Sequence, residues 1–458
     1  MWRATCQHLR AMMLGTLLLL AAQAAPALPT PWPPRLGGGA SPRDTQLVAF
    51  VDVNVVPMNR AGVLERQTVI VRDGKITEVG PTQRVRVPDG AVRIDGRGKY
   101  LMPALGEMHG HLPNPNAGPE ITENVLFLYV ANGVTVVRGM QGTPAHLELK
   151  GRIARGELLG PRLFVPGPPL SGNSAPNPET GRRLVEGQHA AGFDHLKIHE
   201  GLSRDTYDTI AATAKRLGMR FAGHVPNDVG VYHALEAGQT SIDHLDNYAE
   251  TVGGPDSATD QRIGQVVAAT CAARAWTVPT LALWETFLME DPEALAAREE
   301  LRYVPPGWRQ NWSNQLTQIR QNPGGLGGGG EATAALRRRI LKALQDAGCP
   351  IVFGTDSPQL YSVPGFSMHR EMRSMAAAGI SAQDILYAAT RNVARYYSAE
   401  REFGSVAPGQ RADLLLLEGN PLADLGNVAR RAGVLVNGRW MPEADIRARL
   451  DRIAAGYQ

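Results

Sequence analysis

Six residues that could bind metal ions or move protons are spaced along the middle of the chain. They are His109, His111, Lys197, His224, His244 and Asp356. His109 and His111 flank a glycine, and residues i and i+2 of a strand point to the same side, so the two imidazoles would project together. Two neutral imidazoles on one face can chelate a Zn²⁺-type ion. Such a pair can equally be two polar residues on a wet surface, so the prediction depends on the other four residues.

These four residues each end a short apolar run. Lys197 lies in HLKI, His224 ends RFAGH, His244 ends SIDH, and Asp356 ends IVFGTD. Singly, the histidines could be hydrogen-bonded surface residues, and Asp356 could cap a helix. Six such coincidences are harder to accept than one metal site.

Lys197 indicates what kind of site this is. An ordinary lysine has a pKa of about 10.4, and its cation would be repelled by divalent metal ions. A deprotonated lysine that has added CO₂ is an anionic carbamate, whose two oxygens can bridge two metals. The alternative is a lysine that is ion-paired away from the site, with Glu200 as a partner. We therefore expect two divalent metal ions, most simply zinc, bridged by N6-carboxylated Lys197.

The elements that must position these side chains alternate between strands and helices over residues 100–401. The candidate strands are YLMPAL, VTVVR, RLFV, HLKI, RFAGH, SIDH, WTVPT and IVFGTD. Helical stretches separate several of them, which is typical of an α/β fold and predicts a (β/α)8 TIM barrel. In such a barrel the reactive residues lie at the C-terminal ends of the strands.

Both flanks of this region are rich in short strands. Residues 44–99 and 402–446 contain β-branched runs interrupted by turns such as Asp73-Gly74 and Asn437-Gly438. We expect them to form one small β-sandwich domain from both chain ends. Residues 285–330 are long for a barrel connection and rich in tryptophan and arginine, with a run of glycines at the end. They predict either a substrate-covering lid with a flexible hinge or a surface insertion.

The first residues predict a targeting segment. Arg3 and Arg10 form a basic segment that precedes a short apolar stretch. Ala22-Gln23-Ala24 offers a cleavage site for a signal peptide of residues 1–24. The apolar run is shorter than the roughly 20 residues of a membrane span, although an uncleaved anchor is the alternative. Residues 25–43 are rich in Pro and Gly and predict a linker. The mature protein would be exported, periplasmic or secreted.

Composition adds two further expectations. Hydrophobic residues make up 43% and charged residues 20%, with a formal net charge of +3, so we expect a globular enzyme that does not bind nucleic acid. The sequence leaves a homo-oligomer open. Two cysteines, Cys271 and Cys349, follow the signal peptide, and we expect both to be buried apolar residues rather than a disulfide.

The motifs together resemble the amidohydrolase superfamily, and within it the imidazolonepropionase-like and prolidase-like (Xaa-Pro dipeptidase-like) hydrolases. The resemblance covers nearly all of the mature sequence. Its segments are VIVRDGKITEVG, YLMPALGEMHGHL, ANGVTVVRGM, LKIHEG, FAGHVP, SIDHL, FGTDS and GSVAPGQRADLLLLEGNPLADL. It implies that His109, His111 and Asp356 hold the more buried metal, that His224 and His244 hold the more exposed one, and that carboxylated Lys197 bridges them.

These roles predict hydrolysis of an amide bond, in a dipeptide or an N-acyl amino acid. A metal-bridging hydroxide would attack the carbonyl, with Asp356 as general base and then acid. The same centre could instead hydrolyse esters, lactones or phosphotriesters, and a non-catalytic binding protein is the alternative from another class. Four further residues are candidates for supporting the site or contacting substrate, although each could serve packing or lie at the surface. They are Arg138, His146, His199 and Tyr232.

Overall fold

The computed structural model describes residues 46–321 and 330–457. The predicted signal peptide and linker lie outside these residues. Among the described residues, no helix is long and apolar enough to cross a membrane.

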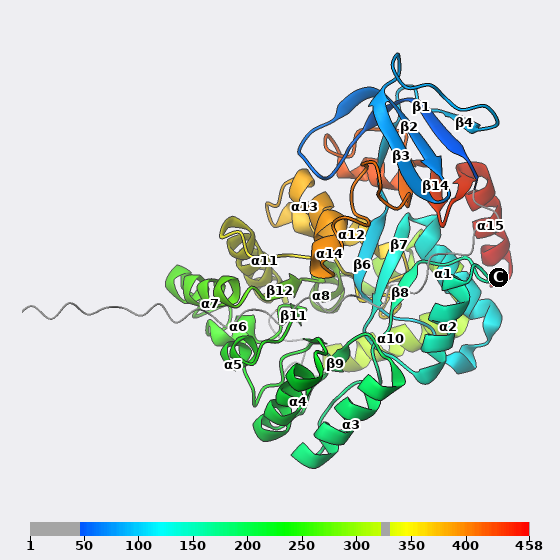
Figure 1. Ribbon diagram of the computed structural model, residues 1–458. Coiled ribbons are helices and arrows are strands. Elements are labelled where there is room, and N and C mark those ends of the chain that lie inside the picture. Colours follow the sequence, from blue (N-terminus) through cyan, green and yellow to red (C-terminus); the bar gives the residue numbers. More distant parts are fainter. Residues whose placement is uncertain (1–45, 322–329, 458) are drawn as a thin grey trace, which may run out of the picture.

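Strands from both ends of the chain pair in one mixed sheet, with the order β15-β14-β13-β5-β1-β2-β3 and β4 beside β1. Figure 1 shows the blue N-terminal strands and the red C-terminal strands in this sheet. Its members are β1 (Val48–Val55), β2 (Leu64–Arg72), β3 (Lys75–Pro81), β4 (Val92–Asp95), β5 (Tyr100–Pro103), β13 (Leu414–Leu417), β14 (Arg431–Val436) and β15 (Arg439–Pro442). The antiparallel pair β5–β13 joins the two chain ends.

Two hairpin turns of this sheet are those the sequence predicts. Asp73-Gly74 and Asn437-Gly438 have positive φ at both residues, as the tightest hairpin turns require. Hydrogen bonding places all eight strands in one sheet, whereas the sequence predicted a sandwich of two. This pairing does not establish a sandwich of two sheets or the predicted domain boundaries, and both stay predictions.

The middle of the chain contains seven short parallel strands in two sheets, β6-β7-β8 and β12-β11-β10-β9. They are β6 (Leu105–Gly110), β7 (Val134–Gly139), β8 (Arg162–Phe164), β9 (Leu196–Ile198), β10 (Phe221–Gly223), β11 (Ser241–Asp243) and β12 (Trp276–Val278). The helices between consecutive strands are α1 (Pro119–Ala131), α2 (Pro144–Ala154), α3 (Pro178–Ala191), α4 (Arg204–Leu217), α5 (Val231–Glu236), α6 (Tyr248–Thr251) and α7 (Asp260–Ala273). After β12 follow α8 (Leu281–Leu288), α9 (Pro292–Ala296), α10 (Pro306–Gln321), α11 (Gly330–Asp346), α12 (Ser367–Ala377), α13 (Ala382–Ala389) and α14 (Arg391–Tyr396), and α15 (Glu443–Ala455) closes the chain.

Two of the eight predicted barrel strands need correction. The run YLMPAL is divided, because β5 belongs to the terminal sheet and the strand that carries His109 begins at Leu105. The run IVFGTD forms no regular strand. Its Ile351 makes one parallel bridge to Thr277, and the carbonyl of Phe353 accepts a hydrogen bond from the N–H of Met108 in β6 at 2.8 Å. Within the described residues the strands therefore form a barrel-like ring that is not a closed sheet.

The insertion is partly described, over residues 285–321. It holds the end of α8, then α9, a 3-10 turn (Glu299–Tyr303) and α10. Its Leu295, Tyr303, Trp312 and Leu316 are buried in the main hydrophobic core. The described part is therefore packed against the body of the protein, and a lid movement stays a prediction.

The two cysteines correct another expectation, because Cys271 and Cys349 form a disulfide. They are separated by 78 positions in the sequence, but their Cα atoms lie 4.8 Å apart. Cys271 lies in the last turn of α7, and Cys349 follows α11, which packs against α7. This proximity is created by the packing of two helices, so a cysteine count could not detect it.

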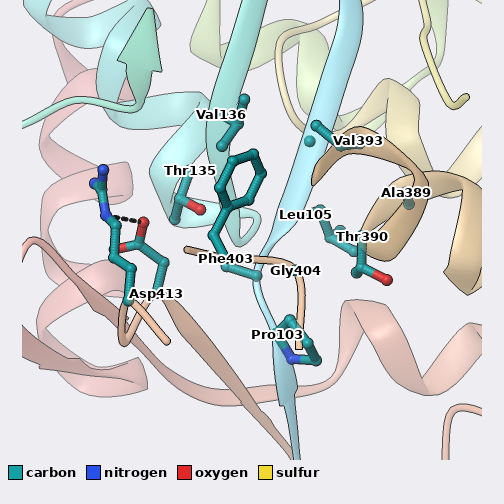
Figure 2. A pocket seen from close by; sticks show the side chains of 13 residues that line it. Pro103, Leu105, Thr135, Val136, Ala389, Thr390, Val393, Phe403, Gly404 and Asp413 are labelled. Carbon is teal, nitrogen blue, oxygen red and sulfur yellow. Dashed lines mark ion pairs between the residues drawn. The ribbon is translucent and has the colours of Figure 1, made fainter. Parts of the chain in front are cut away.

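The terminal sheet meets the barrel at the end where β5 runs into β6. Figure 2 shows a small cavity at this junction, with Phe403 lying beside Thr135 and Val136 of β7 and with Asp413 at its edge. Its volume is about 10 Å³, roughly that of one water molecule, so it cannot hold a substrate. Any site for a small molecule must lie elsewhere.

Candidate metal centre

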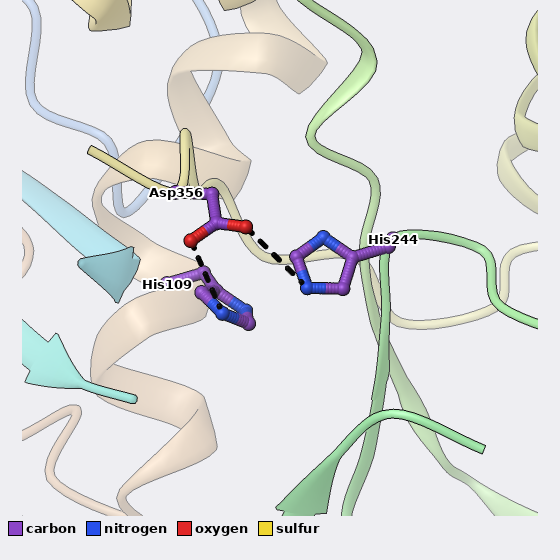
Figure 3. A group of neighbouring side chains, drawn as sticks. All are labelled: His109, His244 and Asp356. Carbon is purple, nitrogen blue, oxygen red and sulfur yellow. Dashed lines mark ion pairs between the residues drawn. The ribbon is translucent and has the colours of Figure 1, made fainter. Parts of the chain in front are cut away.

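The six predicted ligands come from one end of the barrel-like ring. His109 is the second-last residue of β6, and His111 directly follows this strand. Lys197 lies within β9. His224 and His244 directly follow β10 and β11. Because parallel strands end at the same edge, residues far apart in the sequence come together there. Figure 3 shows His109, His244 and Asp356 pointing toward one another from three separate segments.

The carboxylate of Asp356 lies at the centre of this group. Its Oδ1 is 2.5 Å from His111 Nε2 and 3.6 Å from His109 Nε2, and its Oδ2 is 3.6 Å from His244 Nε2. Lys197 Nζ is 3.3 Å from His109 Nε2. Four nitrogen atoms from three segments, at the ends of β6 and β11 and within β9, are thus directed to one small space beside the carboxylate.

Three of the histidines are held by a hydrogen bond at their Nδ1 atom. His109 Nδ1 is 2.7 Å from Asp243 Oδ2, and His224 Nδ1 is 2.6 Å from Asp246 Oδ2. A carboxylate accepts, so each Nδ1 carries the proton and each Nε2 keeps a free lone pair. His244 Nδ1 is 2.8 Å from the hydroxyl of Thr280. Such outer partners orient imidazoles that bind metal ions.

The donor set fits divalent metal ions. His244 Nε2 is buried and has no hydrogen-bond partner among the described residues, which is costly for a polar atom unless a ligand satisfies it. Two groups of side chains have ligand atoms within 4.8 Å of one another. They are His109, His244 and Asp356, and Glu200, His224 and Asp246. Imidazole and carboxylate groups are the ligands expected for Zn²⁺ and similar ions.

Burial favours the neutral form of three of the nitrogen ligands. It lowers the pKa of His109 well below its usual value, aided by Lys197, and it lowers the pKa of His244 to about 4. Burial also lowers the pKa of Lys197, against the opposing effect of Asp243 and Asp356. Burial would raise the pKa of Asp356, but the neighbouring imidazoles outweigh it and hold this pKa well below its usual range. Neutral nitrogens around an ionised carboxylate are the protonation states that metal binding requires.

Asp243 and Thr280 are functional residues that the sequence analysis missed. Asp243 is fully buried and receives hydrogen bonds from His109, from the hydroxyl of Ser241 and from the guanidinium of Arg138. Asp243 precedes His244 in SIDH, so it points to the opposite side of the strand and reaches a different histidine. That alternation was the only available signal.

The four further candidates lie in different environments. His199 lines the cavity above the metal ligands, and its ring centroid is 4.5 Å from that of His224. Arg138 lies beneath the site, fully buried against Asp243 and Tyr396. His146 is buried in α2 with its Nε2 2.9 Å from the carbonyl of Pro113, and Tyr232 is 43% exposed on α5. Arg138, His146 and Tyr232 do not line the cavity, so Arg138 is placed to support a ligand rather than to contact substrate.

A cavity of about 980 Å³ opens over these ligands. It is lined by five of the predicted ligands with nitrogen donors, by Asp356, and by polar and apolar side chains of the surrounding loops. This volume can hold a small organic molecule.

Comparison with known proteins agrees with this geometry. The amidohydrolase family pattern matches residues 100–441. The chain belongs to the amidohydrolase family. It is 24% identical over 390 residues to an adenine deaminase of Paracoccus denitrificans, which covers 83% of this chain but only 55% of the relative, so the chain spans about half the length of that protein.

Solved structures support the fold. A prolidase candidate from Bifidobacterium longum is 25% identical, covers 89% of this chain and 99% of its own, and has a TM-score of 0.67. A Xaa-Pro dipeptidase with bound methionine is 18% identical, covers 86% and 99%, and has a TM-score of 0.66. The chain therefore has a TIM-barrel-like α/β fold, and its described residues include a His/Asp cluster that could hold a metal ion.

Proposed function

We propose that this amidohydrolase cleaves the amide bond of a small molecule, in a dipeptide or an N-acyl amino acid, at a centre of two divalent metal ions. The observation that carries the proposal is the convergence of His109, His244 and Lys197 on the Asp356 carboxylate beneath the cavity. His111 and His224 complete the proposed ligand set at its margin. Prolidase and dipeptidase structures with this fold support an amide substrate.

Lys197 is proposed to carry the bridging carbamate. Its side chain is buried, with 2% exposed, and its lowered pKa favours the neutral amine. A neutral amine adds CO₂ with the release of one proton, which gives an N6-carboxylated lysine with one negative charge. That charge would compensate two cations in a site where an ammonium group would repel them.

The residues divide the chemistry among them. Divalent ions, when bound, lower the pKa of water and polarise a carbonyl oxygen. Asp356, ionised and hydrogen-bonded to His111, is placed to accept a proton from the attacking water and to deliver it to the leaving nitrogen. Asp243, Asp246 and Thr280 keep the imidazoles oriented throughout.

We also propose that the protein is exported after removal of residues 1–24. The Cys271–Cys349 disulfide supports this, because disulfides persist in oxidising compartments such as the periplasm. The N-terminal sequence of the protein recovered from a cell fraction tests the cleavage site. A chain that retains its first residues in the cytoplasmic fraction would contradict export.

The decisive experiment loads the purified full chain with Zn²⁺ in the presence of bicarbonate and measures its metal content and its activity. We expect two metal ions per chain and hydrolysis of dipeptides or N-acyl amino acids. Lys197→Ala should lose metal and activity together, and full activity in that variant would exclude the bridging role. Esters, lactones and phosphotriesters are tested in parallel, and turnover of these alone would contradict an amide substrate.

A further inference from the structure

The cavity over the metal ligands has an apolar side formed by α8 and α10, which are in contact with each other. Its lining side chains, called the wall below, are Leu283, Trp284 and Phe287 of α8 and Ile319 of α10. Phe287 and Ile319 belong to the insertion of residues 285–330, so the insertion supplies part of the binding surface. A concave surface of this composition binds apolar groups by removing them from water.

The charged side chains of the same cavity are acidic. Apart from the six proposed ligands and His199, the described lining residues that can carry a charge are Glu200 and Asp246. Asp246 accepts a hydrogen bond from His224 Nδ1, and Glu200 Oε1 lies 3.6 Å from the same nitrogen. A substrate carboxylate placed beside these two acids would be repelled, so the free carboxylate of a dipeptide or N-acyl amino acid should lie on another side of the cavity.

The apolar side is fixed in place relative to the metal ligand His244. Thr280, the residue before α8, hydrogen-bonds to His244 Nδ1, so its hydroxyl does not cap the helix. Glu371 of α12 takes that role instead, since its buried carboxylate accepts the first two N–H groups of α8 at 2.9 and 2.7 Å. At the other end, Arg320 of α10 donates to the carbonyls of Thr286 and Phe287. These hydrogen bonds therefore fix the position of α8, which carries most of the wall, relative to the proposed metal ligand His244.

We propose that the substrate carries an uncharged apolar group, aromatic or branched aliphatic, that packs against α8 and α10 beside the scissile amide. This inference rests on the proposed amide hydrolysis and specifies its substrate class. Burial of such a side chain contributes enough free energy for a roughly ten- to hundredfold gain in kcat/KM over a methyl group. An amide that carries a carboxylate in the same position gains nothing from the wall, and it must give up the hydration of its charge there.

The test uses the zinc-loaded full chain and a panel of simple amides. Either the acyl side or the amine side carries a benzyl, isobutyl, methyl or carboxyethyl group, with the rest of the molecule unchanged. On one side of the amide, we expect kcat/KM to be about ten- to hundredfold higher for benzyl and isobutyl than for methyl, with carboxyethyl the poorest substrate. Equal values across the panel, or a preference for carboxyethyl, would overturn the inference.

Variants show whether the wall causes the preference. Phe287→Ala and Ile319→Ala should each reduce the benzyl-to-methyl ratio severalfold, because a benzyl group loses more contact with the wall than a methyl group does. Phe287→Leu should restore most of the ratio for isobutyl. Leu316→Ala is the matched control, because Leu316 lies on α10 and is buried but does not line the cavity. A ratio that falls equally in Leu316→Ala, or that is unchanged in both wall variants, contradicts the inference. If no amide is hydrolysed by the metal-loaded chain, the proposed function itself fails.

Discussion

The hydroxyl of Thr280 is the sharpest point at which the proposed metal centre can be perturbed. Thr280 is fully buried, and its Oγ1 lies 2.8 Å from His244 Nδ1. Its φ of +46° is uncommon for a β-branched residue. Thr280→Val keeps the shape and the branching at Cβ, so the backbone strain and the packing are nearly unchanged. The substitution removes only the hydrogen bond to the imidazole.

The expected effect is larger on metal binding than on folding. When Nε2 binds a metal, Nδ1 must keep its proton, and in Thr280→Val this proton is buried without an acceptor, at a cost of about 1–3 kcal/mol. In the metal-free protein the proton can move to Nε2, which faces Asp356 Oδ2 at 3.6 Å. The loss should therefore appear in the affinity for metal, as a roughly ten- to hundredfold rise in Kd. The metal-free protein should lose less than about 1 kcal/mol.

Competition for Zn²⁺ with a coloured chelator gives the Kd, and urea denaturation of the metal-free chain gives the free energy of unfolding. Thr270→Val is the control, because Thr270 is also fully buried and its hydroxyl forms hydrogen bonds with the carbonyl of Val266 and the hydroxyl of Tyr248, each at 2.8 Å, far from the ligands in the sequence. It should lower the free energy of unfolding by about 1 kcal/mol and leave the Kd unchanged. A Kd in Thr280→Val within twofold of the wild-type value would refute the orienting role, as would an equal rise in Thr270→Val.

Two further predictions concern stability. The disulfide closes a long loop, with a separation of 78 residues between Cys271 and Cys349. Its loss in a double serine variant should lower the free energy of unfolding by about 4 kcal/mol. Denaturation of the oxidised wild type and of the variant measures this difference, and equal midpoints would contradict the prediction. Burial raises the pKa of Glu371 to about 8, above its ordinary 4.5, despite the N–H groups it accepts. The folded state therefore holds a proton that the unfolded state releases between these pH values, and stability from this group falls as pH rises. Relative to Glu371→Gln, the wild-type free energy of unfolding should decrease by up to about 1.4 kcal/mol per pH unit in that window. Urea titrations at about pH 5.5 and about pH 7.5 measure this slope, and a constant difference would count against the titration.

The sequence predicted that the six candidate ligands lie at one end of the fold because their positions depend on one regular feature, while their binding of metal stays a prediction. His109, His224 and His244 follow short apolar runs, and parallel strands in a ring bring such ends together without further information. The same regularity misled at Asp356. Its run looks like a strand, but the backbone at Asp356 has a φ of +62°, and residues 350–356 make only two backbone hydrogen bonds to β6 and two to β12.

The features that the sequence did not predict arise from contacts between distant segments. Asp243, Thr280 and Glu371 each form hydrogen bonds with residues that are distant in the sequence. Nothing in their local sequence indicates these partners. The disulfide is of the same kind, since α7 and α11 bring its cysteines together. Strand periodicity predicts which side of an element a residue takes, but it does not predict which residue of another element it meets.

The contacts around His244 connect the metal centre to the substrate wall by two separate routes. Thr280 links the ring of His244 to the start of α8, and Arg337 of α11 donates to the carbonyl of His244 while its guanidinium lies 3.5 Å from the centroid of the Trp284 ring. The ring of His244 is thus held by the residue before α8. Its backbone carbonyl is held by Arg337, whose guanidinium packs on Trp284 of the same wall. A displacement of α8 by an ill-fitting substrate would therefore also disturb a proposed metal ligand. On this arrangement, an amide without a suitable apolar group should lose kcat as well as affinity, because poor contact with the wall and poor alignment at the metal centre have the same structural cause.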